Sequence, residues 1–345
     1  MKPLRRALRH TLPLLATLAA TAAGAAGTPP LSSSASAVLG LDPGLALVTF
    51  GDALLRNSQI NGAAAVGGNA VVSSYSLGGL SVAHDLDFQS GSIRGNAVVG
   101  GHLTSSYAGS FGGSVRVGAG LDARAGLSAP AGATTVWGPL TGVQPWYPAV
   151  QAGSGSFALG LDFQALSRRL SALSASVDGF ANTGSAQLQW GTLHFDASGQ
   201  TLAVFDIDAA ELGHHLQIDN LATDAAVLIN VHGSSVAFGN GGYSNFASGR
   251  VLFNLPEATT LSFDAGVNAS LLAVQASVQP GYGSITGQVV VDRWNSSVQI
   301  NPATFSAMLP AAPVPEPGKL SLLLAGLAVV GLLARRRQRH RAERA

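Results

Sequence analysis

The sequence predicts a mainly β protein whose body, residues 39–308, is a β-helix or similar solenoid with one flanking amphipathic α-helix. Three observations favour this fold class. Apolar segments are short and are separated by Gly, Asn, Ser or Asp, which is typical of strands joined by turns. The composition includes 43 Gly among 345 residues, with only 6% aromatic and 11% charged side chains. A short glycine-containing motif also recurs, which favours stacked coils over a barrel or a sandwich.

The recurring motif begins as Val-Gly-Gly-Asn-Ala at residues 66–70. Val-Gly-Gly-His-Leu follows 33 residues later at 99–103, and Val-Gly-Ala-Gly-Leu follows after a further 18 at 117–121. Glycine adopts positive φ without strain, so we expect the paired glycines at coil corners in that conformation. They are Gly67, Gly68, Gly100 and Gly101. Inward positions are expected to hold small apolar side chains, because neighbouring coils stack about 4.8 Å apart.

One helix is predicted, over residues 162–177. Its apolar side chains are spaced three or four residues apart, which places them on one helix face. Asp162 is a suitable N-cap residue. Arg168 and Arg169 are expected on the opposite side, away from the sheet that the helix covers. The apolar positions are Phe163, Leu166, Leu170, Leu173 and Val177.

The second half of the body contains the clearest strand patterns. Each is a short run of apolar and β-branched residues bounded by turn-forming residues. The predicted strands are Thr201–Ile207, Ala226–Val231, Arg250–Asn254, Thr260–Phe263, Leu271–Val278, Gly287–Val291 and Ser297–Ile300.

Charge and cysteine content exclude several functional classes. Between residues 28 and 314 the chain has eight Arg and no Lys against fourteen Asp and two Glu, a balance of −8. This acidic body lacks the basic stripe of a nucleic-acid-binding protein. The absence of Cys excludes disulfides, thiolate zinc sites and a cysteine nucleophile.

Residues 1–27 are typical of a secretory signal peptide. Basic residues precede an apolar stretch from Leu12 to Ala23, and Ala23-Gly24-Ala25 offers small residues to signal peptidase. The alternative is a transmembrane anchor, but the apolar run is short of the roughly 20 residues that a span needs. Residues 28–38 are rich in Pro, Ser and Ala and are expected to form a linker.

The C-terminal end has three expected parts: a Pro/Ala stem at 309–319, a transmembrane helix at 320–334 and a basic cytoplasmic tail at 335–345. The helix would cover about 22 Å of a hydrocarbon core about 30 Å thick, so it is a short span. Flanking positive charge stays in the cytoplasm, which implies an exported body. The arginines that follow the helix are Arg335, Arg336, Arg337, Arg339 and Arg341, and Lys319 flanks its other end.

Pro315, Glu316 and Pro317 stand directly before this apolar run. A Pro-Glu-Pro triplet, a short apolar helix and a terminal arginine cluster, in this order, resemble the PEP-CTERM sorting signal of Gram-negative bacteria. The resemblance implies cleavage near the motif by a membrane-bound exosortase. The protein would pass through an inner-membrane intermediate to the cell surface or extracellular matrix. The alternative is an ordinary single-pass anchor with a proline-rich stem.

The body as a whole resembles the choice-of-anchor A domain, an adhesive domain of bacterial surface proteins. The matching stretches appear in family order and span roughly residues 40–300. The resemblance implies a β-helix-like surface domain and brings no catalytic site. The stretches are Val48–Asp52, Ile60–Ala70, Val227–Val231, Val251–Ala258 and Gly283–Val289.

One polar cluster could have chemistry of its own. Asp206, Asp208 and Glu211 offer carboxylate oxygens of the kind that Ca²⁺ prefers, and Glu211 with His214 could hold a transition metal. Alternatively, Asp206 and Asp208 alternate with apolar residues and form the solvent-facing side of a strand. No metal or other cofactor is predicted on balance.

These observations predict an exported, non-enzymatic surface or matrix protein that contributes to adhesion or associates with exopolysaccharide. A polar solenoid face could hydrogen-bond glycans through many weak contacts. Two alternatives remain. An ice-binding solenoid would need Thr in register, and the chain has no sustained Thr-x-Thr series. A carbohydrate-active β-helix enzyme would need a carboxylate pair, for which the 206–211 cluster is the nearest candidate.

Overall fold

The computed structural model describes residues 39–306, apart from 107–108, 124–126, 131–132, 143–149 and 240. The predicted signal peptide, linker, stem, transmembrane helix and basic tail lie outside the described residues. Within the described part of the chain, no helix is long and apolar enough to cross a membrane.

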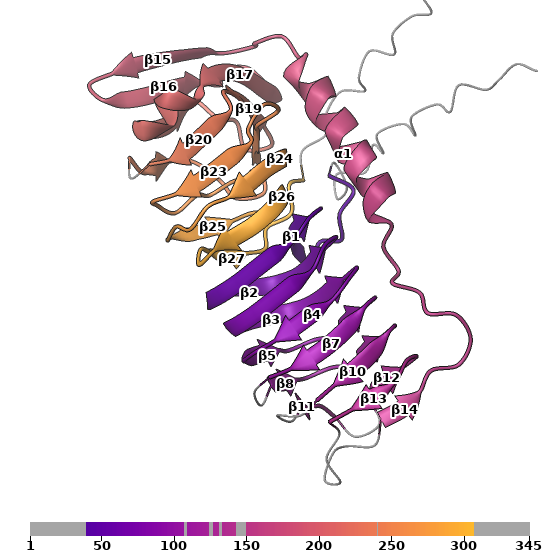
Figure 1. Ribbon diagram of the computed structural model, residues 1–345. Coiled ribbons are helices and arrows are strands. Elements are labelled where there is room, and N and C mark those ends of the chain that lie inside the picture. The colour runs from indigo at the N-terminus through magenta and orange to yellow at the C-terminus, as the bar shows by residue number, and fades with distance from the viewer. Residues whose placement is uncertain are drawn as a thin grey trace, which may run out of the picture. The chain divides into compact units, whose positions relative to one another are not determined.

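The described residues form two stacks of strands, which pair in parallel except for an antiparallel hairpin at residues 185–196 (Figure 1). We call residues 45–152 the N-terminal stack. Its strands are β1 (Leu45–Thr49), β2 (Ala53–Val66), β3 (Ala70–Val82), β4 (Leu86–Phe88), β5 (Gly91–Ile93), β6 (Ala97–Val99), β7 (His102–Ser105), β8 (Gly109–Phe111), β9 (Val115–Val117), β10 (Gly120–Asp122), β11 (Leu127–Ser128), β12 (Thr134–Val136), β13 (Leu140–Thr141) and β14 (Val150–Ala152).

Helix α1 (Phe163–Asp178) follows, and residues 185–301 then form what we call the C-terminal stack. It contains one short 3-10 helix, η1 (Ala209–Gly213). Its strands are β15 (Ser185–Gln189), β16 (Thr192–Asp196), β17 (Leu202–Asp208), β18 (His215–Asp219), β19 (Ala226–His232), β20 (Ser235–Phe238), β21 (Tyr243–Ser244), β22 (Val251–Asn254), β23 (Thr260–Phe263), β24 (Ser270–Val278), β25 (Ser284–Thr286), β26 (Val289–Ser296) and β27 (Gln299–Asn301). Each predicted strand of this half is present, with ends that differ by a few residues.

Parallel pairing between successive coils divides the solenoid into three faces. We call the first the covered face: it contains β1, β6, β9 and β12 in one stack and β17, β19 and β22 in the other. The open face contains β4, β7 and β10, and β20 and β23. The serine face contains the middle of β2 and β3, then β5 and β8, and also β25 and β27. The solenoid architecture predicted from the sequence is therefore present.

The two stacks meet at β1, and the order of coils differs from the order of the chain. β1 pairs with β2 on one side and with β26, from the other end of the body, on the opposite side. The chain thus builds the N-terminal stack away from β1, returns through α1, and builds the C-terminal stack back toward β1. The long return connection allows strands that are far apart in sequence to become parallel neighbours.

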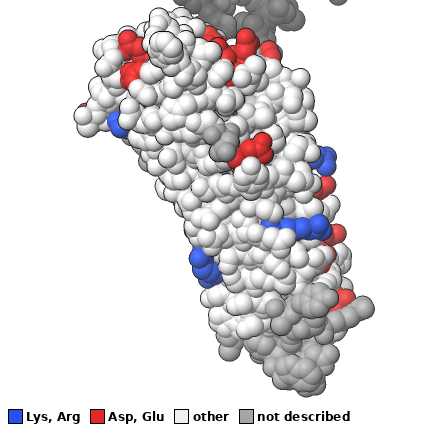
Figure 2. Space-filling model, turned by 90° about the vertical axis from the view of Figure 1, so that its left-hand side faces the viewer, with Lys and Arg blue, Asp and Glu red and all other residues white. Residues whose placement is uncertain are grey.

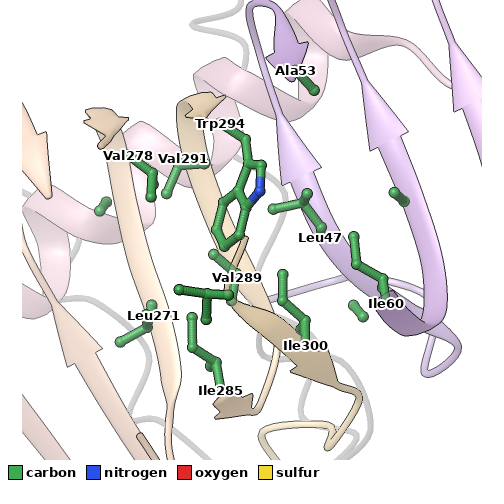
Figure 3. Close-up of a cluster of buried hydrophobic side chains, with 14 of the residues drawn as sticks. Leu47, Ala53, Ile60, Leu271, Val278, Ile285, Val289, Val291, Trp294 and Ile300 are labelled. Carbon is green, nitrogen blue, oxygen red and sulfur yellow. The ribbon is translucent and has the colours of Figure 1, made fainter. Parts of the chain in front are cut away.

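A shared apolar core joins the two stacks across this junction. Trp294 is buried beside Leu47, and Ile60 of β2 pairs in register with Ile300 of β27 (Figure 3). Strand alternation places these side chains inward, since neighbouring residues on a strand point to opposite sides. The inward positions are apolar, as predicted, but many hold Leu, Ile or rings such as Phe88 and Phe111, which are larger than the small side chains expected.

The predicted helix is confirmed, including its N-cap. The side chain of Asp162 accepts a hydrogen bond from the Ala165 amide at 2.9 Å, and the helix begins at the next residue. Leu166, Leu170 and Leu173 are buried, as expected for the face that packs on β22 and β24. This cover explains why the strands beneath are apolar on both sides.

The position predicted for Arg169 is wrong. Its guanidinium is half-buried and donates hydrogen bonds to the backbone oxygens of Leu39 and Gly40, at 2.6 and 3.2 Å. Burial lowers the pKa of Arg169. Arg168, in contrast, is exposed as predicted. Arg169 stands three residues after Leu166 and four before Leu173, so helix periodicity places it beside the apolar face, where Leu39 and Gly40 accept its hydrogen bonds.

The paired glycines lie in bends between strands, as predicted, but the predicted reason is wrong. None of the four has positive φ. The coils instead approach so closely that a side chain would collide with the neighbouring backbone. A Cβ on Gly68 would lie 2.6 Å from the Gly51 carbonyl carbon, and one on Gly101 would lie 2.8 Å from that of His84. Glycine is needed here for space and not for backbone freedom.

A ladder of side-chain caps explains the irregular repeat. Oδ1 of Asp52 accepts a hydrogen bond from the backbone N–H of Asn69 at 2.8 Å. Oδ1 of Asn69 in turn accepts one from the backbone N–H of Asp85. Asp85 then accepts from the His102 amide at 2.7 Å. Successive partners are 17, 16 and 17 residues apart, so the 33-residue spacing in the sequence is two coils.

Candidate functional site

An uncharged ladder of polar side chains follows the serine face through the N-terminal stack. Gln59 pairs in register with Ser76, and Ser76 pairs with Ser92. Ser110 follows on β8 and Ser128 on β11. The Oγ atoms of Ser76 and Ser92 are 2.6 Å apart, so these two hydroxyls are hydrogen-bonded to each other.

The alternation of each strand produces this ladder. Ile60, Leu77 and Ile93 are fully buried in the core, so the residue before each of them points outward. The ladder continues into the C-terminal stack, because the pairing of Ile60 with Ile300 places Gln59 beside Gln299. Hydroxyls and amides therefore repeat at the spacing of the coils, about 4.8 Å.

Most of the surface on the side away from α1 carries no charge (Figure 2). Near the serine ladder, Arg94 donates a hydrogen bond to Asn61, and Asn61 donates one to Asn301 at 2.6 Å. The serine face can therefore form many hydrogen bonds through uncharged groups. It lacks the dense charge that would select a nucleic acid or a strongly ionic partner.

Acidic side chains gather at the end of the C-terminal stack, at the top of Figure 2. Residues 170–249 contain no Lys or Arg, and four of the eight histidines of the chain. The acidic residues of this segment, which we call the acidic end, are Asp178, Asp196, Asp206, Asp208, Glu211, Asp219 and Asp224.

A shallow groove of about 360 Å³ lies on the outward side of β15, β16 and β18, within the acidic end. Strand register arranges its lining in rows: Ser185 lies opposite Asp196, which lies opposite Asp219, and Gln187 lies opposite His194. Only polar side chains line the groove. They are Ser185, Gln187, Gln189, His194, Asp196, Asp219 and Asn220.

Hydrogen bonds fix both carboxylates of the groove. Oδ1 of Asp196 accepts bonds from the hydroxyl and amide of Ser198, at 2.6 and 3.1 Å, and from Asn220 at 3.1 Å. The bond from the Ser198 hydroxyl contributes most to lowering the pKa of Asp196. The pKa of Asp219 is lowered mainly by the bond from Gln217, with help from His194, whose Nδ1 lies 2.8 Å from Oδ2. Both carboxylates are therefore ionised at neutral pH.

The metal ligands considered in the sequence do not come together. Asp208 and Glu211 form the capping box of η1, and His214 follows that helix as its C-cap. Oδ1 of Asp206 accepts a hydrogen bond from Asn230 at 2.8 Å and lies 4.0 Å from Nε2 of His232. Among the described residues, no group of three or more His, Cys, Asp or Glu side chains is placed to hold a metal ion.

The predicted sorting and membrane-flanking residues lie outside the described residues. They are Pro315, Glu316, Pro317, Lys319, Arg335, Arg336, Arg337, Arg339 and Arg341. Their assignment depends on sequence alone.

Comparison with known families identifies both parts of the chain. Residues 44–302 match the family described as "Putative Ice-binding-like adhesive domain". The chain belongs to this family. Residues 313–338 of the same chain match the PEP-CTERM protein-sorting motif, which confirms the resemblance noted from Pro315, Glu316 and Pro317. The ice-binding-like adhesive domain and the sorting motif together mark an exported, adhesive type of surface protein.

Other comparisons add little. No curated protein matches this chain. Among solved structures, the chain is similar to an ice binding protein from an Antarctic bacterium of the Flavobacteriaceae, with 12% identity over 78% of this chain and 82% of that one. The TM-score is 0.17, so this likeness carries no argument.

Sequence reasoning missed both the serine ladder and the groove. The serines that form the ladder recur at the coil spacing, but Ser is common throughout the chain and their register was hidden by the unequal coil lengths. The groove depends on the pairing of β16 with β18, which places Asp196 beside Asp219. No sequence signal linked those two residues, since they belong to different coils.

Proposed function

We propose that this protein is an exported, exosortase-processed and non-catalytic adhesin that binds exopolysaccharide at the cell surface or in the extracellular matrix. The observation that carries the proposal is the presence of an adhesive-type domain and a sorting motif on one chain. The earlier resemblance to the choice-of-anchor A domain agrees with this role, and we retain that assignment as part of the proposal.

The serine face is the proposed adhesive surface. Its hydroxyl and amide groups are neutral, repeat at the coil spacing and match the hydroxyl-rich surface of an extended polysaccharide. Each hydrogen bond in water contributes only about 0.5–1.5 kcal/mol, so single contacts are weak. The hydrogen-bonding groups repeat along the stack, and many copies of the protein can bind one polymer. Together these repeated weak contacts make the total binding strong.

The proposed maturation route uses both ends of the chain. Signal peptidase removes residues 1–27, and the helix at 320–334 holds an inner-membrane intermediate with the basic tail in the cytoplasm. An exosortase then cleaves near Pro315, Glu316 and Pro317. A span shorter than the hydrocarbon core suits a segment that is recognised and removed.

A non-catalytic role is also part of the proposal, and the electrostatics of the groove support it. Glycoside hydrolysis uses a carboxyl pair in which the general acid has a raised pKa. Asp196 and Asp219 have lowered pKa values instead, so neither holds a proton at neutral pH. This pair is suited to binding a ligand and not to protonating a leaving group.

Ice binding is a second candidate, favoured by the description of the family. A flat face with groups in register suits an ordered water lattice. The outward ladder of the serine face consists of Ser and Gln, however, whereas an ice-binding solenoid is expected to present Thr in register. Thermal hysteresis of the purified protein would select this candidate, and its absence would leave adhesion.

Adhesion is tested with the surface form purified from producing cells and the producer's own exopolysaccharide. Replacing Ser76, Ser92 and Ser110 with Ala removes three hydroxyls without adding bulk. We expect at least tenfold weaker co-sedimentation with the polymer, since three contacts of about 0.5–1.5 kcal/mol are lost.

A matched control removes three hydroxyls from the open face, by replacing Thr104, Thr260 and Ser262 with Ala. This variant should bind the polymer like the wild type. Equal binding by both variants would reject the serine face as the adhesive surface. Mass spectrometry of the same material tests processing: peptides from Leu320 onward in the surface form would contradict cleavage by an exosortase.

A further inference from the structure

The groove on β15, β16 and β18 brings together two negative charges that hydrogen bonds stabilise but that no Lys or Arg of residues 170–249 neutralises. Asp196 and Asp219 lie directly opposite each other on paired strands, and both are ionised. Like charges in this position destabilise a sheet. Because residues 170–249 contain no Lys or Arg, the only cationic side chains that this segment can offer are histidines.

The lining also provides neutral hydrogen-bonding groups beside this negative charge. Gln187 and Gln189 extend from β15, the strand that pairs antiparallel with β16 at the end of the sheet. Amides both donate and accept, as hydroxyl groups of a sugar do. All described hydrogen bonds to Asp196 are accepted by Oδ1, so its other oxygen is used by none of them.

An exposed aromatic side chain lies next to the groove residue Gln189 in the sequence. Trp190 follows Gln189 at the tip of the β15–β16 hairpin, with a φ of 51°, and its side chain is fully exposed. A tryptophan that packs against nothing is unusual, since large apolar side chains are normally covered. Its ring can stack on a sugar unit of a chain that extends beyond the groove.

The lining as a whole fits a larger ligand better than a single cation or a small amine. A divalent cation prefers several oxygen ligands, and the described residues include no cluster of three His, Cys, Asp or Glu side chains placed to hold one. A small amine would pair with the carboxylates but would make no use of the amides of Gln187 and Gln189, which bond each other at 3.2 Å. A ligand that has both an ammonium group and hydroxyl groups uses the whole lining.

We propose that this groove binds an amino-sugar polysaccharide with free amino groups, whose ammonium group lies between Asp196 and Asp219 while its hydroxyls bond the amides of β15. The inference rests on the proposed function, and it narrows the polysaccharide to one chemical class. Charge-assisted hydrogen bonds to two carboxylates select the ammonium form over the N-acetylated form.

The test uses the full-length chain in detergent, with soluble glucosamine oligomers as the probe and N-acetylglucosamine oligomers of equal length for comparison. Replacing Asp196 and Asp219 with Asn keeps the side-chain shapes, and the Asn oxygens can still accept the bonds from Ser198, Asn220 and Gln217. We expect at least tenfold weaker binding of the glucosamine oligomers, measured by calorimetry.

The matched control is the double variant D224N/D264N, which removes two exposed negative charges outside the groove. It should change the affinity less than threefold. Equal binding of both oligomers by the wild type, or equal loss in both double variants, would overturn the proposal. Unchanged melting temperatures show that the D196N/D219N variant is folded.

The outcome separates this inference from the proposed function. If the serine-face variant no longer binds exopolysaccharide while D196N/D219N binds glucosamine oligomers like the wild type, the groove assignment is wrong and adhesion remains. If the wild type binds neither exopolysaccharide nor oligomers, both proposals are wrong.

Discussion

The two stacks share one architecture but bury their covered face differently. One outward column runs through both stacks, from Val290 through Val48 and Ala65 to Ser81 and Val98. At Val290 the column is fully buried, whereas at Val98 it is partly exposed. The column therefore has two solvent environments, although its strand geometry is the same along its length.

The coils also differ in length. Hydrogen-bonded side chains in successive coils are 16 to 18 residues apart in the N-terminal stack, as between Asp85 and His102. In the C-terminal stack, Asp206, Asn230 and Asn254 follow one another at intervals of 24 residues. Leu252 and Ser270, and likewise Leu271 and Val289, are only 18 residues apart, so the longer coils are those farther from β1.

The comparison teaches that stability and repetition come from different parts of the molecule. The N-terminal stack presents regular outward ladders, because short coils place equivalent residues side by side. The C-terminal stack has strands that are apolar on both sides, as in a parallel sheet with helices on it. We expect the same substitution to cost more in the second setting than in the first.

The largest predicted effect tests this difference with identical chemistry. Val290→Ala should lower the free energy of unfolding by about 2–3 kcal/mol, because a fully buried side chain leaves a cavity. Val98→Ala, in the same column but partly exposed, should cost about 1 kcal/mol or less. Urea unfolding of the full chain measures both. Equal costs would mean that the two solvent environments of this column do not differ in their effect on stability.

The sequence was sufficient to predict the parts of the fold that depend on local pattern. Asp162 and the apolar spacing after it gave the helix correctly, and the strand patterns after residue 200 gave the C-terminal strands. The glycine motif indicated stacked coils, although its spacings of 33 and 18 residues did not show that the first covers two coils. The helix and strand signals each lie within one helix or one coil, where the spacing of apolar side chains and the capping residues determine the structure.

The parts that could not be predicted depend on pairing between distant segments. Nothing in β1 indicates that its second neighbour is β26, because both are short apolar strands that would fit many partners. The groove is missed for the same reason, since Asp196 meets Asp219 only through the register of two coils. The contacts of Arg169 could not be predicted either, because Leu39 and Gly40 lie about 130 residues away in the sequence.

A second, smaller effect concerns a buried polar ladder beneath α1. Asn254 is fully buried, accepts a hydrogen bond from the Ser174 hydroxyl at 2.6 Å, and donates to Asn230 at 3.0 Å. Such a ladder fixes the helix over one position of the stack, because each amide must keep its partners. The N-terminal stack places exposed caps at its corners instead, as at Asp85.

Ser174→Ala should therefore cost about 1–2 kcal/mol of unfolding free energy, because the buried Asn254 oxygen loses a donor. Ser171→Ala is the matched control, since Ser171 is exposed on the same helix and the change has the same effect on helix propensity. This control should leave the stability unchanged or slightly higher. A Ser174 variant as stable as the control would show that the ladder does not hold the helix in place.

The smallest predicted effect is the response of the acidic end to pH. Asp196 and Asp219 have folded-state pKa values below those of the unfolded chain, so the folded state binds fewer protons. Their contribution to stability is present above the unfolded value of about 3.9 and is lost as the pH falls through the folded values. Between pH 6 and 3, the wild type should therefore lose more stability than D196N/D219N, as measured by urea unfolding.

The pKa of Asp219 alone provides a more specific test of the interaction between Asp196 and Asp219. The charge of Asp196 raises the pKa of Asp219, although hydrogen bonds from Gln217 and His194 outweigh it. Asp196→Asn removes that repulsion and keeps the bonds to Gln217 and His194, so the pKa of Asp219 should fall further. Titration of the Asp219 carboxyl followed by NMR checks this. An unchanged or higher pKa would mean that the two carboxylates do not share one electrostatic site, and the ammonium-binding groove would lose its physical basis.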